Sequence, residues 1–202
     1  MKFAILASVA AAIVATPAAA QETPTFSGLS LAVLGGYDSV RLSDGSDSGS
    51  SDGFMYGVSV GYNADLGSAV VGVEAEIGDS AVKETATDLI VTDDELSVRA
   101  ARDLYVGFRA GAKLTPNALI YAKAGYTNAR FEARYNDGVD TVSDGSNLDG
   151  YRLGAGLEYS FGRIGVRGEY RFSDYGKLKF DDINTGISAQ RHQVVIGLVA
   201  KF

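Results

Sequence analysis

The chain has 202 residues, with 18 Lys and Arg, 25 Asp and Glu, one His and no Cys, and its formal net charge is −7. The net negative charge and the lack of a basic patch argue against a nucleic-acid-binding protein. No zinc-ligand spacing or phosphate-binding motif occurs, so we expect no cofactor and no metal centre. Without cysteine the chain forms no disulfide, although small exported domains often depend on them.

The first twenty residues have the pattern of a secretory signal peptide. Lys2 precedes an apolar run over residues 3–14, and Pro17 and three alanines stand before Gln21. This is a positive region, a short apolar region and a small-residue cleavage site. The run is shorter than the roughly 18–20 residues of a membrane-spanning helix, which argues against a membrane anchor. We predict a cleaved signal peptide at residues 1–20 and a single exported domain at residues 21–202.

Eight segments of this domain alternate apolar with polar or small residues, which is the period of a β-strand. The second segment is the clearest, since its even-numbered residues from Phe54 to Tyr62 are all aromatic or Val. In chain order the predicted strands are Leu29–Val40, Phe54–Asn63, Ala69–Gly78, Val98–Leu114, Leu119–Ala133, Tyr151–Phe161, Ile164–Ser173 and Val194–Phe202. The last strand runs to the terminal Phe202, and an apolar strand left unpaired there would promote aggregation. We therefore expect it to pair with the first strand and close a barrel.

The connections alternate between short and long. The short ones lie near residues 63–68, 113–118 and 162–163, and the long polar ones near residues 42–53, 79–97, 134–149 and 174–190. Tight periplasmic turns and long external loops are typical of outer-membrane barrels. A soluble eight-stranded barrel of the lipocalin type would point its apolar faces inward, whereas here the opposite face collects Gly, Ser and ionised residues. We predict an all-β fold, an eight-stranded antiparallel up-and-down transmembrane β-barrel.

Charge is distributed unevenly along the chain. The four long connections hold 16 acidic and four basic residues, so the predicted external surface is strongly acidic. Simple solvation accounts for acidic loops, and the alternative is a surface that favours cations or basic partners. Because lipopolysaccharide is anionic, divalent ions would mediate contact with it.

Ionised residues also occupy the face opposite the apolar one. They are Glu74, Glu76, Asp103, Arg109, Lys123, Glu158, Arg167, Glu169 and Arg171. An eight-stranded barrel is only wide enough for side chains to fill it, so opposite charges there should pair. Counting from the strand ends places Glu74, Arg109, Lys123 and Glu169 in one layer, with Glu158 slightly lower. We interpret this set as a structural charge network that fills the lumen, and the alternative is a gated conductance pathway.

Four stretches in the expected order resemble small outer-membrane surface antigens, the opacity-protein-like and OmpA-barrel-like proteins of Gram-negative bacteria. They cover residues 104–111, 119–126, 167–176 and 193–202, and the resemblance extends over the whole mature chain. The first strand departs from the pattern, since Leu29-Ser30-Leu31 stands where aromatics are usual. The resemblance implies location in the outer membrane and recognition of Phe202 by the insertion machinery. It also implies that the loops determine partner specificity, and these loops match nothing that identifies a partner.

Two chemical alternatives have weaker support. Outer-membrane acyl hydrolases carry a Ser-His-acid set on the barrel surface, and His192 is the one candidate here. Ser188 lies only four residues away, a poor arrangement for a nucleophile, so we expect no enzymatic activity. The loop from Asp44 resembles a calcium loop, but its twelfth position is Met55 where a bidentate Glu is required. We read it as a Ser/Gly/Asp loop.

The sequence therefore predicts an integral outer-membrane protein with a structural, surface-interaction role. Its expected partners are outer-membrane lipid, lipopolysaccharide and the insertion machinery, with an unknown partner for the loops. The alternative is a narrow porin that passes small, preferably cationic, solutes.

Overall fold

The computed structural model describes residues 26–43, 48–87, 95–136, 141–180 and 183–202. Its strands are β1 (Gly28–Ser43), β2 (Ser48–Asp65), β3 (Ala69–Ser80), β4 (Lys83–Thr87), β5 (Glu95–Thr115), β6 (Ala118–Asn136), β7 (Thr141–Phe161), β8 (Ile164–Phe180) and β9 (Ile183–Lys201). Within these ranges no helix is long and apolar enough to cross a membrane. The predicted signal peptide lies outside the described residues.

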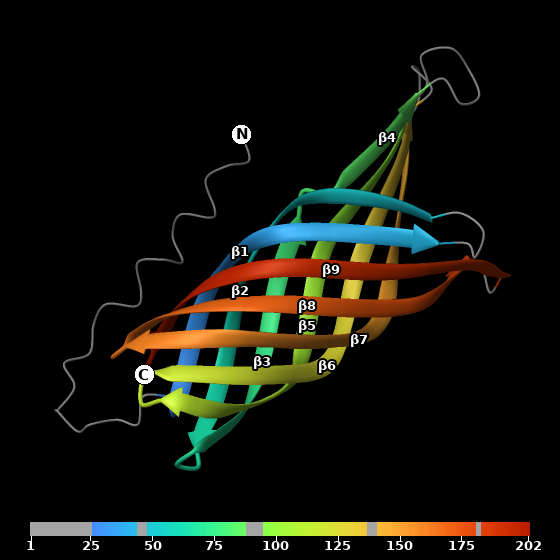
Figure 1. Cartoon of the computed structure of the whole chain (residues 1–202). Coiled ribbons are helices and arrows are strands. Elements are labelled where there is room, and N and C mark those ends of the chain that lie inside the picture. The colour runs from blue at the N-terminus through green and yellow to red at the C-terminus, as the bar shows by residue number, and fades with distance from the viewer. Residues whose placement is uncertain (1–25, 44–47, 88–94, 137–140, 181–182) are drawn as a thin grey trace, which may run out of the picture.

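The strands form one antiparallel sheet that closes on itself (Figure 1). The hydrogen-bonded order runs from β3 through β2, β1, β9, β8, β7 and β6 to β5, and β3 pairs with β5 to complete the circle. β4 also pairs with β5, beyond the end of β3, and an irregularity in β5 between Ala100 and Asp103 separates the two pairings. β3 and β4 thus occupy one position in the wall, and the predicted eight-stranded barrel is confirmed.

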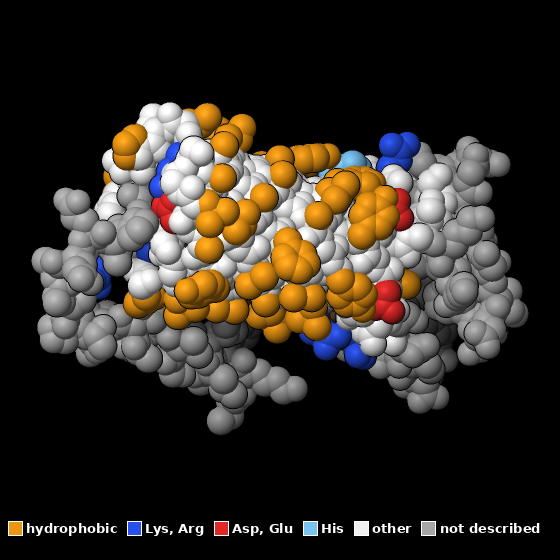
Figure 2. All heavy atoms as spheres, turned by 90° about the horizontal axis from the view of Figure 1, so that it is seen from below, with side chains coloured by type: hydrophobic (Ala, Val, Ile, Leu, Met, Phe, Trp, Pro, Cys, Tyr) orange, Lys and Arg blue, Asp and Glu red, His pale blue; other side chains and the backbone are white. Residues whose placement is uncertain are grey.

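The outer wall of the barrel is apolar. Val58 is 50% exposed, Phe108 74% and Leu157 56%, whereas Glu74 and Arg109 are buried. Figure 2 shows apolar side chains spread over the side of the barrel between its two ends. Exposing this much apolar surface to water would be unfavourable at about 25 cal/mol per Å². The predicted register, with apolar residues outward and ionised residues inward, is confirmed.

The strands are longer than the alternation predicted. β7 begins at Thr141 rather than Tyr151, and β8 continues to Phe180 rather than ending at Ser173. The segments expected to be long loops are therefore largely β-hairpins, which leave the barrel at the end away from the C-terminus (Figure 1). Alternating hydrophobicity reports contact with lipid, but backbone pairing continues beyond the lipid. We call this end the hairpin end, and the end with the short connections the turn end.

The first and last strands close the barrel as predicted. β1 and β9 pair continuously from Ser30 opposite Lys201 to Ser43 opposite Ser188. At the turn end, the Phe202 amide donates a hydrogen bond to the Leu29 carbonyl at 2.9 Å. Gly28 has φ of +97°, and a Cβ there would lie 2.3 Å from the Phe202 carbonyl oxygen. Only Gly fits this close approach between the two ends of the sheet.

Candidate functional site

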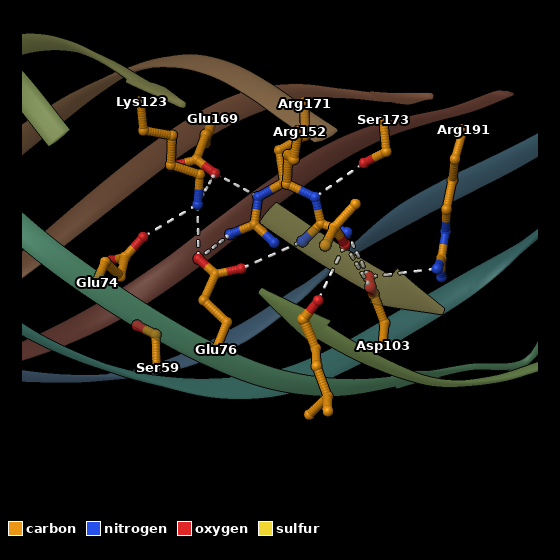
Figure 3. A network of polar contacts seen from close by, with 12 residues as sticks. Ser59, Glu74, Glu76, Asp103, Lys123, Arg152, Glu169, Arg171, Ser173 and Arg191 are labelled. Atoms are coloured by element: carbon orange, nitrogen blue, oxygen red, sulfur yellow. Dashed lines mark hydrogen bonds and ion pairs between the residues drawn. The ribbon is translucent and has the colours of Figure 1, made fainter. Parts of the chain in front are cut away.

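The lumen is filled by ionised side chains, which we call the lumen charge network (Figure 3). Among the described residues, its carboxylates are Asp38, Glu74, Glu76, Asp103, Glu158 and Glu169, and its cations are Arg109, Lys123, Arg152, Arg167, Arg171, Arg191 and Lys201. Each of these residues is at most 9% exposed. Their inward direction follows from the strand period, because the same alternation that sends apolar side chains outward sends these inward.

Lys123 lies at the centre of the network. Its Nζ is 3.0 Å from Glu74 Oε1, 2.6 Å from Glu76 Oε1 and 2.8 Å from Glu169 Oε1. Gly154, opposite Lys123 on β7, leaves room for the lysine stem, since a Cβ there would lie 3.1 Å from Lys123 Cγ. One ammonium group therefore joins carboxylates from β3 and β8.

Two arginines of β8 complete the pairing of these carboxylates. Arg167 pairs with Glu74 and donates to Ser59 Oγ at 3.1 Å. Arg171 Nη2 lies 2.9 Å from Glu76 Oε1, and its Nε pairs with Glu169. Every carboxylate at this level thus has at least two cationic neighbours, which offsets the cost of placing charge in the barrel interior.

The network continues toward the hairpin end. Arg152 binds Asp103 at 2.6 Å and donates to Ser173 Oγ at 2.9 Å. Arg191 lies 3.2 Å from Asp103 and also binds Asp38. Asp38 in turn accepts a hydrogen bond from Ser80 Oγ at 2.5 Å. These contacts join β1, β3, β5, β7, β8 and β9 across the lumen.

A separate cluster lies at the turn end. Arg109 Nη2 binds Glu158 at 2.5 Å, and Lys201 Nζ lies 2.8 Å from the other oxygen of Glu158. The Arg109 guanidinium stacks 3.9 Å from the centre of the Tyr121 ring, and the Tyr121 hydroxyl donates to Glu169 at 2.7 Å. Glu74, Lys123 and Glu169 meet as the predicted layer requires, whereas Arg109 pairs with Glu158 and not with these carboxylates, so the predicted common layer holds only in part. Strands of a barrel are tilted and staggered, so equal counts from the strand ends do not give equal heights.

All nine ionised residues that the sequence places on the inward face lie in this network. Sequence reasoning missed Asp38, Arg152, Arg191 and Lys201. Asp38, Arg152 and Lys201 occupy inward-facing positions of predicted strands, so the alternation could have identified them. Arg191 precedes the predicted start of the last strand at Val194, so only a longer strand would have included it.

Within the described residues, His192 and Ser188 each contact other partners. His192 Nδ1 lies 2.7 Å from the Tyr170 hydroxyl, and its ring lies 5.1 Å from that of Phe172. Ser188 Oγ instead donates to the Ser43 carbonyl at 3.2 Å. Residues 44–47 of the calcium-like loop lie outside the described residues. Elsewhere in the described ranges, no group of three or more His, Asp or Glu is placed to hold a metal ion.

Asp149 marks the border of the apolar wall at the hairpin end. It is exposed, accepts hydrogen bonds from the Tyr126 hydroxyl and from Asn128 Nδ2, the latter at 2.7 Å, and lies just beyond Tyr151 on β7. These two hydrogen bonds, with that from Tyr126 the larger cause, hold the pKa of Asp149 below its usual value. Tyr126 and Tyr151 are half-exposed, as expected of aromatic residues at a membrane interface.

The comparisons with known proteins all match outer-membrane β-barrel proteins. A family model described as outer membrane protein beta-barrel domain matches residues 5–202. The chain is 29% identical to the 31 kDa outer-membrane immunogenic protein of Brucella melitensis over 241 aligned residues, which cover 100% of both chains. It is 29% identical over 178 residues to the 22 kDa outer membrane protein of Rhizobium leguminosarum bv. viciae, covering 84% of this chain and 76% of that relative.

A solved structure shares the fold. Neisserial surface protein A superposes with a TM-score of 0.52 at 16% identity, covering 85% of this chain and 97% of that chain. At this identity the likeness concerns the fold alone.

Proposed function

Since the chain belongs to the outer membrane protein beta-barrel domain family and is located in the outer membrane of a Gram-negative bacterium, we propose that it is a non-enzymatic structural protein of that membrane. In this role the barrel anchors the chain in lipid, and the external hairpins contact the surroundings of the cell. The lumen charge network holds the barrel closed. The single observation that carries this proposal is the dense pairing of buried charges across the lumen.

The pairing supports a closed lumen for an energetic reason. Opening a passage would separate Lys123 from carboxylates at 2.6–3.0 Å, and a buried charge left without its partner costs about 3–5 kcal/mol. A cavity of about 10 Å³ lies against Leu34, Met55, Glu76 and Arg152, which is room for about one water molecule. A space of this size holds solvent but does not form a channel.

One observation favours the second candidate, a narrow porin. Both amide atoms of Gln193 and the Nε atoms of Arg109 and Arg167 are buried without a protein partner. Water in the lumen would satisfy them, and a continuous water path would conduct. However, the described network has seven cations against six carboxylates, which does not support a preference for cationic solutes.

Conductance of the refolded protein in a planar bilayer separates the two functions. A silent bilayer with wild-type protein supports the structural role, and steady single-channel conductance overturns it in favour of the porin. The variant Lys123→Met removes the central cation, and Lys113→Met at the turn end is a matched control that leaves the centre intact. A conductance that appears only in Lys123→Met would show that this residue closes the lumen.

The surface role requires the hairpin end to face outward. The chain has no native cysteine, so a single introduced thiol reports its own location. In intact cells, Asn147→Cys on β7 should react with a membrane-impermeant maleimide, whereas Asn117→Cys in the β5–β6 turn should not. The reverse labelling would contradict the proposed orientation.

Assembly and external partners complete the proposal. Phe202 directly follows the closing strand and is 47% exposed at the turn end, which makes it available to the insertion machinery. Phe202→Ala should reduce the amount of folded protein in the outer membrane, measured as the heat-modifiable band in membrane fractions. The acidic hairpins and the outer wall would contact lipopolysaccharide, with divalent ions between the anionic groups.

A further inference from the structure

Phe26 lies inside the barrel although it precedes the first strand. It comes two residues before Gly28, where β1 begins, yet it is only 1% exposed. Its ring packs with Val70, Leu119 and Tyr121. Val70 and Leu119 are the second residues of β3 and β6, so the ring sits in the lumen at the turn end, which is the periplasmic end of such barrels.

The ring also contacts the last residue of the closing strand. Lys201 Nζ lies 4.1 Å from the centre of the Phe26 ring, in cation–π geometry. The same ammonium group lies 2.8 Å from Glu158, which binds Arg109 at 2.5 Å. An apolar layer made by Phe26 and its neighbours therefore lies directly against the charged cluster at the turn end.

The Phe26 ring lies beside the seam where the first and last strands close the barrel. β1 follows Phe26, and Lys201 is the last residue of β9, so the contact between them lies on the inner side of the β1–β9 pairing. Val70 on β3 and Leu119 on β6 belong to other parts of the wall. The cluster around Phe26 thus connects the last strand to two more distant strands.

We propose that Phe26 plugs the periplasmic mouth of the barrel and fastens the first strand to the last. The ring excludes water from the cluster of Arg109, Glu158 and Lys201. This apolar plug acts independently of the charge pairing that closes the middle of the lumen, so it goes beyond the function proposed above.

Access of water to the site is measurable with one introduced thiol. Val70 is 0% exposed and belongs to the same buried cluster as the ring. The variant Val70→Cys should react with a small water-soluble maleimide at least about tenfold more slowly than Asn117→Cys, because reaction requires local opening. Both proteins are refolded in detergent, and the gel shift between heated and unheated samples shows that each barrel is closed. Equal labelling rates in the two folded proteins would overturn the plug.

Removing the Phe26 ring tests whether the ring causes the protection of Val70→Cys. Adding Phe26→Ala to Val70→Cys should raise the labelling rate at least about tenfold, and Phe26→Leu, which refills most of the volume, should restore the protection. The control Phe108→Ala removes the same side chain from the lipid-facing wall, where it is 74% exposed, and should leave the rate unchanged. An unchanged rate in Phe26→Ala would contradict the proposal.

A second thiol separates local opening from unfolding. Ala129 is 1% exposed at the hairpin end of the lumen, and Ala129→Cys should stay protected when Phe26→Ala is introduced. If both thiols become reactive together, the ring stabilises the whole barrel and is not a local plug. If Phe26→Ala does not fold, the protection of Val70→Cys in the Phe26→Leu background decides whether a filled mouth excludes water.

Discussion

Arg191 binds Asp38 through two parallel hydrogen bonds, from Nε to Oδ1 at 2.8 Å and from Nη2 to Oδ2 at 2.5 Å. The two residues belong to β9 and β1, the strands that close the barrel, and both are at most 1% exposed. A bidentate guanidinium–carboxylate pair is among the strongest and most directional polar contacts in proteins. The seam is therefore held from inside at the hairpin end by this pair, and at the turn end by Phe26 and Lys201.

The Asp38–Arg191 pair should be necessary for a stable seam. Asp38→Asn retains the size of the side chain but removes its charge, which leaves Arg191 with Asp103 at 3.2 Å. We expect the free energy of unfolding to fall by about 3–5 kcal/mol, as for other broken buried pairs. Urea unfolding in micelles, followed by the gel shift of the folded band, measures this change.

Asp65→Asn is the control for that variant. Asp65 pairs with Lys113 at the turn end, where the Lys113 side chain is 20% exposed. A more solvated pair contributes about 0–1 kcal/mol, so its loss should matter much less. An effect of Asp65→Asn as large as that of Asp38→Asn would show that the seam pair has no special role.

The central lysine should be more important than any single carboxylate around it. Lys123→Met leaves Glu74, Glu76 and Glu169 without the ammonium group that lies within 3.0 Å of all three. We expect a loss of about 3–5 kcal/mol in the free energy of unfolding. Adding Glu169→Gln should recover part of this loss, since one repelling charge is then removed, and a further loss in the double variant would contradict the proposed network.

Much of this architecture could be predicted from the sequence because lipid contact repeats every second residue. The register of residues such as Val58 and Glu74 follows from that period alone, and it placed the ionised side chains in the lumen. Strand ends such as Thr141 could not be predicted, since hairpins beyond the lipid need no apolar face. Pairing across the lumen, as between Arg109 and Glu158, depends on strand tilt and stagger, which the alternation of one strand does not contain. Phe26 lies outside any strand, so no alternating pattern predicted its burial.

The outer wall should tolerate charge only near its borders. Val58 lies in the middle of β2 and is paired with Val33 and Ile77, which are also exposed. Val58→Arg should lower the free energy of unfolding in lipid vesicles by about 2–4 kcal/mol, whereas Asn147→Arg at the hairpin end should change it by about 0–1 kcal/mol. Equal effects at the two sites would mean that the apolar wall does not face lipid.

The external border of the wall should respond to acid through Asp149. Hydrogen bonds from Tyr126 and Asn128 lower its pKa in the folded protein, so its contribution to stability is complete above the unfolded-state pKa of about 3.9. This contribution is lost as the pH falls through the lowered folded-state pKa. Asp149→Asn should therefore unfold at a lower temperature than wild type at neutral pH, and the difference should vanish once the pH falls below the lowered folded-state pKa. Tyr126→Phe removes the main donor and should reproduce part of the effect, while a difference that persists in acid would exclude Asp149 as the titrating group.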